Sequence, residues 1–193
     1  MNKQDLIKKN IKDSLKIKKE LLKNETLIKQ IVEIADLIIK AFKTEKKLLF
    51  CGNGGSAAEA QHLAAEFSGR YYLNRAPLHA EALHTDTSFM TAVANDFSFD
   101  EVYSRLIKGI GKDGDILIGM STSGNSKNVT KALEQAKKQG LITIGFTGKK
   151  GGEMNNHCDL IINIPSNDTP RIQECHLMLG HAICELVEKE LFS

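Results

Sequence analysis

The chain has no tryptophan, only three prolines and no C-x-x-C pair among its four cysteines. The lack of tryptophan excludes nothing, but the cysteine spacing argues against a disulfide framework or a paired-cysteine metal site. The cysteines lie in apolar or helical surroundings, which favours reduced thiols and predicts a cytoplasmic protein. They are Cys51, Cys158, Cys175 and Cys184. The net charge of only +2 gives no reason to expect nucleic acid as a partner.

Long hydrophobic runs are also missing. No segment is apolar for long enough to span a bilayer, so we expect no membrane partner. The lysine-rich start alternates Ile and Leu with Lys and lacks the apolar block of a signal peptide. The length suits one domain with a sizeable core. We therefore expect a single domain over 1–193, with helices in 1–45 and an α/β core with a C-terminal helix in 46–193.

Apolar periodicity predicts strands that alternate with helices. Each expected strand is a continuous apolar run, which is typical of a parallel sheet covered on both faces, and the fold class is therefore a doubly wound α/β domain with an N-terminal helical extension. Strands are expected at 48–51, 115–120, 141–146 and 159–164, and a strand or irregular segment at 78–84. Helices are expected at 3–23, 25–42, 56–67, 99–107, 127–139 and 170–191, with a short helix capped by Asp86.

The first expected helix, 3–23, has an apolar stripe opposite a face dense in lysine. Two interpretations stay open for it. It is either a solvated amphipathic helix or a helix that buries its stripe against another subunit.

A glycine-rich turn, Gly52-Asn53-Gly54-Gly55, follows the first expected strand, and Ser56 opens the next helix. Such a strand–turn–helix start points backbone N–H groups at an anion. The turn fits the dinucleotide pattern G-x-G-x-x-A only loosely, because no acidic residue follows about 20 positions later. The turn therefore predicts an anion site without a nicotinamide or flavin cofactor.

The loop after the 115–120 strand is rich in hydroxyl groups. It carries four of them within six residues, on Ser121, Thr122, Ser123 and Ser126. Hydroxyls and N–H groups at the start of a helix suit a phosphate monoester. The carboxyl ends of parallel strands share one edge of a sheet, so both polar loops are expected on the same side.

Imidazole and carboxylate groups recur on two of the expected helices. His62 and Glu66 are four residues apart and share a helix face, while His181 lies beside the buried face of the last helix. Either Gln173 or Glu174 could complete a four-ligand site with them, and periodicity does not choose between the two. Nitrogen and oxygen donors of this kind suit zinc.

Four segments resemble the sedoheptulose-7-phosphate isomerases, a branch of the sugar isomerase (SIS) domain family. They are CGNGGSAAEAQHLAAEFSGRY, AVANDFSF, GMSTSGNSKNV and TPRIQECHLMLGH. The resemblance implies a three-layer αβα sandwich and a homotetramer with active sites between subunits. It implies one Zn²⁺ per subunit on His62, Glu66, Gln173 and His181, and thereby selects Gln173. Phosphate would be held by Ser56, Ser121, Ser123 and Ser126 with Thr122 nearby, and sugar hydroxyls by Asn53, Gly54, Gly55, Asn95, Asp96 and Gln173.

The implied activity converts sedoheptulose 7-phosphate to D-glycero-D-manno-heptose 7-phosphate, an early step toward nucleotide-activated heptose for lipopolysaccharide or capsule. Glu66 would be the base, also in contact with substrate, and His181 would move the oxygen-borne proton. The alternatives are a non-catalytic SIS module, such as a replication-initiator-associating protein or a sugar-phosphate sensor, and an isomerase of another phosphosugar. We expect His79, His84 and His157 to be surface or satisfied histidines and 148–152 to be a solvated turn.

Overall fold

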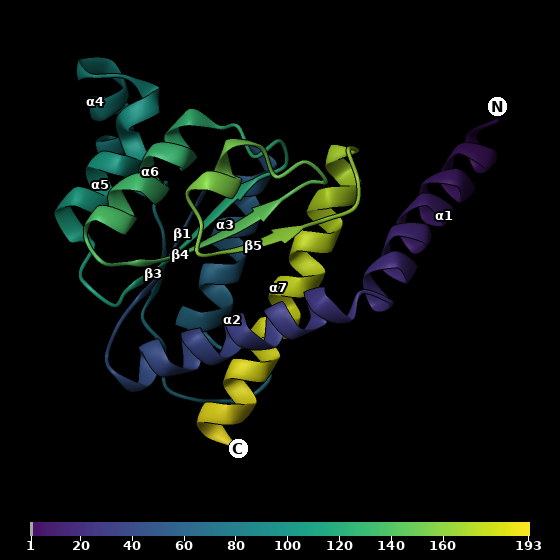
Figure 1. Ribbon diagram of the computed structural model, residues 1–193, viewed down its shortest axis with the longest axis horizontal. Helices are drawn as coiled ribbons and strands as arrows, with labels where there is room; N and C mark the ends of the chain where they lie inside the picture. The colour runs from purple at the N-terminus through teal and green to yellow at the C-terminus, as the bar shows by residue number, and fades with distance from the viewer. Residues whose placement is uncertain (1) are drawn as a thin grey trace.

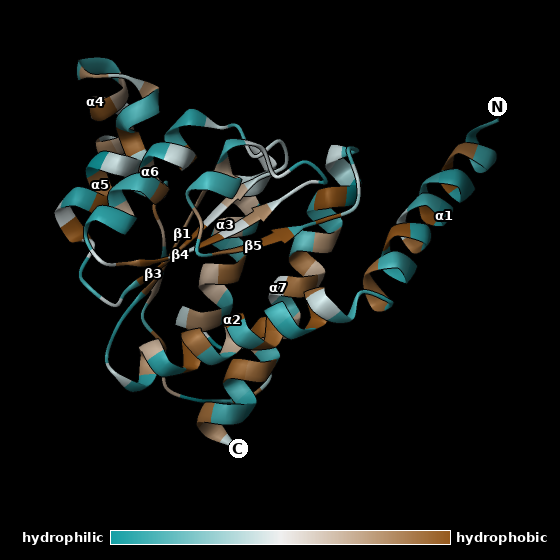
Figure 2. Cartoon of the chain, in the orientation of Figure 1, coloured by the Kyte–Doolittle hydropathy of each residue, from teal (hydrophilic) through white to brown (hydrophobic). Residues whose placement is uncertain are grey.

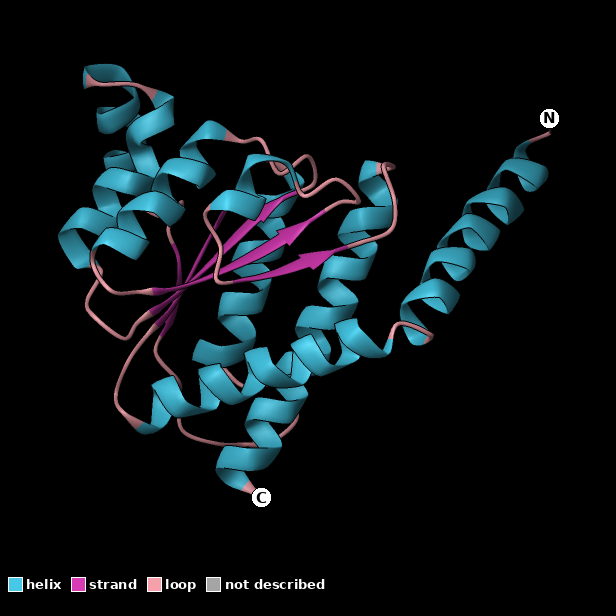
Figure 3. Cartoon of the chain, in the orientation of Figure 1, coloured by secondary structure: helices cyan, strands magenta, loops and turns pink. Residues whose placement is uncertain are grey.

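The computed structural model describes residues 2–193 and shows five parallel strands between two layers of helices (Figures 1 and 3). The strand order in the sheet is β2-β1-β3-β4-β5. The strands are β1 (Leu48–Gly52), β2 (Ala80–Ala82), β3 (Ile116–Ser121), β4 (Ile142–Thr147) and β5 (Leu160–Asn163). The helices are α1 (Lys3–Leu22), α2 (Glu25–Lys43), α3 (Gly55–Ser68), α4 (Thr87–Asp96), α5 (Val102–Ile110), α6 (Lys127–Lys138) and α7 (Thr169–Phe192). Two short 3₁₀ helices are η1 (Phe99–Glu101) and η2 (Gly152–Asn156).

Side chains that alternate along the strands build two separate cores. Leu48 and Phe50 of β1 face a core shared with α2, α3 and α7. Leu49 and Cys51 face the opposite core, which α5 and α6 cover. Both faces of each central strand are therefore apolar, which explains the continuous hydrophobic runs in the sequence. The doubly wound fold and the αβα layers are confirmed.

The order of the strands sets the place of a ligand site. From β1 the chain first adds β2 on one side and then β3, β4 and β5 on the other. In sheets of this kind ligands bind at the carboxyl ends of the two strands where the direction reverses. Those strands are β1 and β3, with Gly52 paired to Met120 in the register. The glycine-rich turn and the hydroxyl-rich loop follow directly from these two ends.

Capping side chains explain several helix starts. Asp86 accepts a hydrogen bond from the N–H of Phe89 at 2.9 Å, as expected of the cap of α4. Asn24 accepts from Leu27 at 3.1 Å and so separates α2 from α1. The expected helix at 99–107 is divided into η1 and α5, and η2 was not expected at all. The uncertain segment at 78–84 forms the edge strand β2, only three residues long.

Helix α1 extends away from the rest of the chain toward its N-terminal end (Figure 1). Ile17 and Leu21 are buried, whereas other members of its apolar stripe are exposed, as the brown bands on α1 in Figure 2 show. The exposed members are Leu6, Ile7, Ile11, Leu15 and Leu22. Among residues 2–193, no helix combines the length and apolarity that crossing a bilayer requires.

Candidate functional site

The hydroxyl groups of the 121–126 loop converge. The Oγ atom of Ser121 lies 2.9 Å from that of Ser126 and 3.4 Å from that of Ser123. Ser121 ends β3 and Ser126 caps α6, so the loop places these hydroxyls at the positive end of a helix. The three serines thus come together as predicted. Neutral hydroxyls and N–H groups in this arrangement can bind a phosphate monoester.

The glycine turn is shaped by close backbone contacts. Gly54 has φ +55°, which glycine adopts without strain. A Cβ atom on Gly52 would clash with the carbonyl group of Ser56. The buried hydroxyl of Tyr103 donates to the carbonyl oxygen of Gly52 at 2.5 Å, and burial raises the pKa of Tyr103, so the donor stays protonated. These contacts fix the entry into α3.

Asn53 and Asn128 join the turn to the start of α6. Their side-chain amides exchange two hydrogen bonds, at 2.8 and 2.9 Å, and Asn128 is 2% exposed. The pair holds the two polar loops at a fixed separation. Sequence reasoning missed Asn128, although it lies two residues after Ser126 in the same motif.

The expectation of a merely solvated turn at 148–152 is wrong for its backbone. The N–H of Gly148 donates to the carbonyl oxygen of Thr122 at 3.1 Å, and the N–H of Met154 donates to that of Gly124 at 3.0 Å. A Cβ atom on Gly124 would overlap the carbonyl group of Gly151. Only the side chains of the two lysines in this turn are exposed. The segment therefore braces the hydroxyl-rich loop from outside.

Three side chains form a potential metal-binding group on α3 and α7. Ligand atoms of His62, Glu66 and His181 all lie within 4.8 Å of one another. The two imidazole Nε2 atoms are 2.8 Å apart, and Oε1 of Glu66 is 3.3 Å from Nε2 of His62. The sequence-predicted pair on α3 and the distant His181 are thus brought together. The side chains of His62 and Glu66 are 47% and 23% exposed, so ions and small molecules can reach the group.

This donor set fits zinc. Two imidazole nitrogens and a carboxylate oxygen are typical of a catalytic zinc site, which keeps one position open. Nitrogen ligands at about 2.0–2.1 Å from one tetrahedral ion lie roughly 3.3 Å apart, so the rings of His62 and His181 would separate by about 0.5 Å on binding. That movement is small for side chains at the protein surface.

Gln173 and Glu174 differ in their contacts. Glu174 accepts from Arg171 at 2.6 Å and is not in the group of three. The amide of Gln173 packs against Gly55, where a Cβ atom would clash with it. Gln173 also lines a cavity of about 490 Å³ together with Gly55 and His62. Glu174 lines the same cavity, so these contacts within one chain do not choose between Gln173 and Glu174 as a fourth ligand.

A buried pair in the same region was not found from the sequence. Glu59 of α3 and His176 of α7 are 4% and 0% exposed, and Oε2 of Glu59 lies 3.7 Å from Nδ1 of His176. Neither oxygen of Glu59 has a hydrogen-bond partner among residues 2–193. Nε2 of His176 contacts the carbonyl oxygen of Thr147 at 3.2 Å. A Glu three residues before His62 on α3 was the signal that could have found the pair.

Other expected site residues lie apart. Asn95 and Asp96 are exposed at the end of α4, where their side chains hydrogen-bond to each other at 2.9 Å. Helix α4 packs on η1 and α5, on the opposite side of the sheet from α7 (Figure 1). Within one chain these two residues do not join the group on α3 and α7. His79 and His157 face the carboxylates of Glu81 and Glu134.

Comparisons with known proteins agree on one family. The SIS domain family matches residues 11–148. A phosphoheptose isomerase of Clostridium acetobutylicum is 50% identical over 98% of this chain and 96% of its own length. A phosphoheptose isomerase of Sulfurimonas denitrificans is 49% identical over 96% of this chain and 95% of its own. Sequence likeness therefore extends across both helices of the potential metal site.

A solved structure supports the same grouping. The phosphoheptose isomerase of Neisseria gonorrhoeae superimposes with a TM-score of 0.91 at 39% identity, covering 97% of this chain and all of the other. Its likeness covers the sheet and the helices of both layers.

Proposed function

This chain belongs to the phosphoheptose isomerases of the SIS domain family, and from that premise we propose that it converts sedoheptulose 7-phosphate to D-glycero-D-manno-heptose 7-phosphate. One observation carries the proposal: two imidazoles and a carboxylate from α3 and α7 converge in a chain whose 121–126 loop gathers three hydroxyls at the start of α6. Ser56, Ser121, Ser123 and Ser126 would hold the phosphate, with Thr122 beside them. Asn53, Gly54, Gly55 and Gln173 would contact sugar hydroxyls.

The reaction moves a carbonyl group from C2 to C1. Glu66 removes a proton from C1 and returns it to C2, while His181 transfers the hydroxyl proton from O1 to O2. Because Oε1 of Glu66 faces His62, the second oxygen is left for the substrate. The pocket between α3 and α7 must hold the enediolate formed between the two proton transfers.

We further propose that His62, Glu66, Gln173 and His181 bind one Zn²⁺ per subunit. When bound, the ion would act as a Lewis acid toward the two sugar oxygens. The proposal is supported by the three converging donors. Gln173 contacts Gly55, two turns before His62 on α3, and its place in the set follows from the resemblance described for the sequence.

A homotetramer with active sites between subunits is part of the same proposal. Asn95 and Asp96 do not reach the cluster of their own chain, so they would contribute to a neighbour's site. Next to them Phe97 and Phe99 are 57% and 53% exposed, which suits an interface. The apolar stripe of α1 offers a second surface for a neighbouring subunit.

We place the enzyme in the cytoplasm, where its four free cysteines would stay reduced. Its product would supply nucleotide-activated heptose for lipopolysaccharide or capsule. These assignments follow from the proposed reaction.

A direct assay tests the function. Purified protein is incubated with five-, six- and seven-carbon ketose phosphates, with and without a chelator, and aldose formation is followed. We expect turnover of sedoheptulose 7-phosphate above the others and a loss with chelator that Zn²⁺ restores. Preference for a shorter sugar would change the substrate, and phosphate binding without turnover of any sugar would indicate a binding module.

A further inference from the structure

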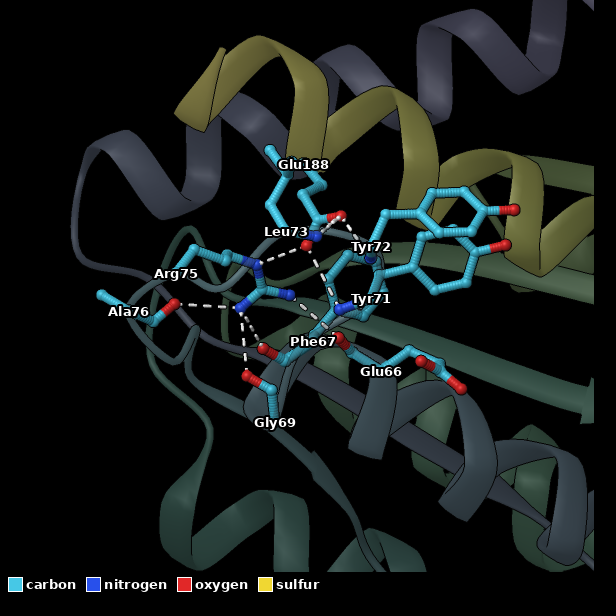
Figure 4. Close-up of polar contacts among 9 residues, drawn as sticks. All are labelled: Glu66, Phe67, Gly69, Tyr71, Tyr72, Leu73, Arg75, Ala76 and Glu188. Atoms are coloured by element: carbon cyan, nitrogen blue, oxygen red, sulfur yellow. Dashed lines mark hydrogen bonds and ion pairs between the residues drawn. The ribbon is translucent and has the colours of Figure 1, made fainter.

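A buried ion pair joins α7 to the segment that follows α3. The carboxylate of Glu188 accepts hydrogen bonds from the backbone N–H groups of Tyr71, Tyr72 and Leu73 at 3.2, 2.7 and 3.0 Å (Figure 4). It also accepts from Nε of Arg75 at 3.0 Å. Both charged side chains are nearly inaccessible, at 3% and 2% exposure. We call Glu188 and Arg75 the clamp.

Arg75 donates its other hydrogen bonds to carbonyl groups at the end of α3 and to that of Ala76, at 2.9 Å from Nη1. Its Nη2 donates to the carbonyl oxygen of Glu66 at 2.9 Å, and Nη1 donates to that of Phe67 at 2.8 Å. The last carbonyl groups of a helix have no partner within the helix, and a cation there is favourable. The clamp therefore hydrogen-bonds to the backbone carbonyl group of Glu66, whose side chain is the proposed base.

The same segment reaches His181. The ring of Tyr71 lies 5.8 Å from that of His181, centroid to centroid, and Glu188 holds the backbone of Tyr71. His181 and Glu188 are seven residues apart on α7, so they lie on nearly the same helix face, two turns apart. The clamp thus contacts the backbone of one proposed catalytic residue and the aromatic neighbour of the other.

We propose that Arg75 and Glu188 are positioning residues that set the separation of Glu66 and His181 for proton transfer and metal binding. The inference rests on the proposed function of those two residues. Two helices from distant parts of the chain must meet with sub-ångström accuracy, and a misplacement of about 1 Å can cost roughly 100-fold in rate. The forked guanidinium of Arg75 and the four hydrogen bonds to Glu188 fix the orientation of α7 relative to the end of α3, as well as the distance between them.

Conservative variants test this role. Glu188→Gln keeps the shape and loses the charge, and Arg75→Lys keeps the charge and loses the fork. We expect each to lower kcat for sedoheptulose 7-phosphate and the affinity for Zn²⁺ by about 10–100-fold, the range seen when supporting contacts of a metal site are removed. KM and inhibition by inorganic phosphate should change by less than about threefold, because the hydroxyl-rich loop is untouched.

The control is another buried ion pair. Asp115 is 1% exposed, and its carboxylate accepts from Nζ and the backbone N–H of Lys47 and from the N–H of Lys112, residues that belong to neither α3 nor α7. Asp115→Asn should lower the melting temperature while kcat and Zn²⁺ affinity of the folded protein stay near wild type. All variants are assayed well below their melting temperatures.

The outcomes separate the two proposals. Wild-type kcat and Zn²⁺ affinity in both clamp variants, equal losses in Asp115→Asn, or failure of both clamp variants to fold would overturn the positioning role. If the wild-type protein turns over no sugar, the proposed function fails. The positioning role of the clamp is then tested by Zn²⁺ affinity alone, measured as competition between the protein and a chromophoric chelator for Zn²⁺. Absence of Zn²⁺ binding and of turnover in the wild type would overturn both.

Discussion

The hydroxyl-rich loop, residues 121–126, and the His62–Glu66–His181 cluster are built in opposite ways. The loop gathers its hydroxyls from six consecutive residues, with Ser121 and Ser126 in direct contact. The cluster joins two imidazoles that are 119 residues apart in the chain and 2.8 Å apart in space. The proposed phosphate binding would therefore depend on local backbone geometry, whereas the proposed chemistry would depend on how two helices pack. Substitutions in the cluster should therefore lower kcat, and substitutions in the loop should raise KM.

The largest effect is expected on the side of the cluster. Glu66→Gln removes the proposed base but keeps its shape, so kcat should fall by about three orders of magnitude with KM nearly unchanged. Steady-state kinetics with sedoheptulose 7-phosphate measures both constants. Glu134→Gln, a carboxylate paired with His157, serves as the control and should behave as wild type. Activity of Glu66→Gln within tenfold of wild type would remove Glu66 from the role of base.

The contrast between the two regions also explains what the sequence could predict. Turn glycines, a capping serine and a run of hydroxyls are local signals, and the hydroxyls of Ser121, Ser123 and Ser126 do converge at the end of β3. Helical spacing likewise put His62 and Glu66 on one face. That His181 would join them could be suspected from its position beside a buried face, but angles along α7 left Gln173 and Glu174 equivalent. The resemblance to the sedoheptulose-7-phosphate isomerases, and not the helix angles, selected Gln173.

Contacts between distant segments were the part that no pattern predicted. Arg75 and Glu188 are 113 residues apart, and neither belongs to a motif. Glu59 and His176 are ordinary helix residues until α3 and α7 pack together. The turn at 148–152 reads as polar and flexible in the sequence, and only its proximity to Gly124 reveals the bracing role. Periodicity reports which face of an element is buried, and it does not report which partner that face meets.

An intermediate effect is expected on the side of the loop. The double variant Ser121→Ala/Ser126→Ala removes two hydroxyls that would bind a charged phosphate, at about 1.5–3 kcal/mol for each such hydrogen bond when fully used. We expect KM to rise by at least about 100-fold with kcat at saturation nearly unchanged. Ser104→Ala, whose hydroxyl contacts Glu101 outside the site, is the matched control. A fall in kcat at constant KM would contradict the proposal that the loop binds the phosphate while the cluster carries out the chemistry.

The smallest effect is expected on the stability of the protein at low pH. Burial by itself raises the pKa of Glu188, but the N–H groups of Leu73, Tyr72 and Tyr71 and the Arg75 side chain outweigh it, so the pKa lies below its ordinary value of 4.5. The folded chain then binds fewer protons than the unfolded chain, and the stability from this group is present above about pH 4.5 and lost as the pH falls through the lowered pKa.

Urea unfolding between about pH 3 and 6 measures this dependence. The free energy of unfolding of the wild type should fall more steeply toward low pH than that of Glu188→Gln, by at most about 1.4 kcal/mol per pH unit for one proton. Other carboxylates with lowered pKa, such as Asp159, contribute equally to both proteins and cancel in the difference. The Ser121→Ala/Ser126→Ala variant should keep the wild-type slope, because hydroxyls do not titrate in this range. Equal slopes of unfolding free energy against pH for wild type and Glu188→Gln would show that ionisation of Glu188 adds nothing to stability. The clamp and the hydroxyl-rich loop would then not differ in their response to pH.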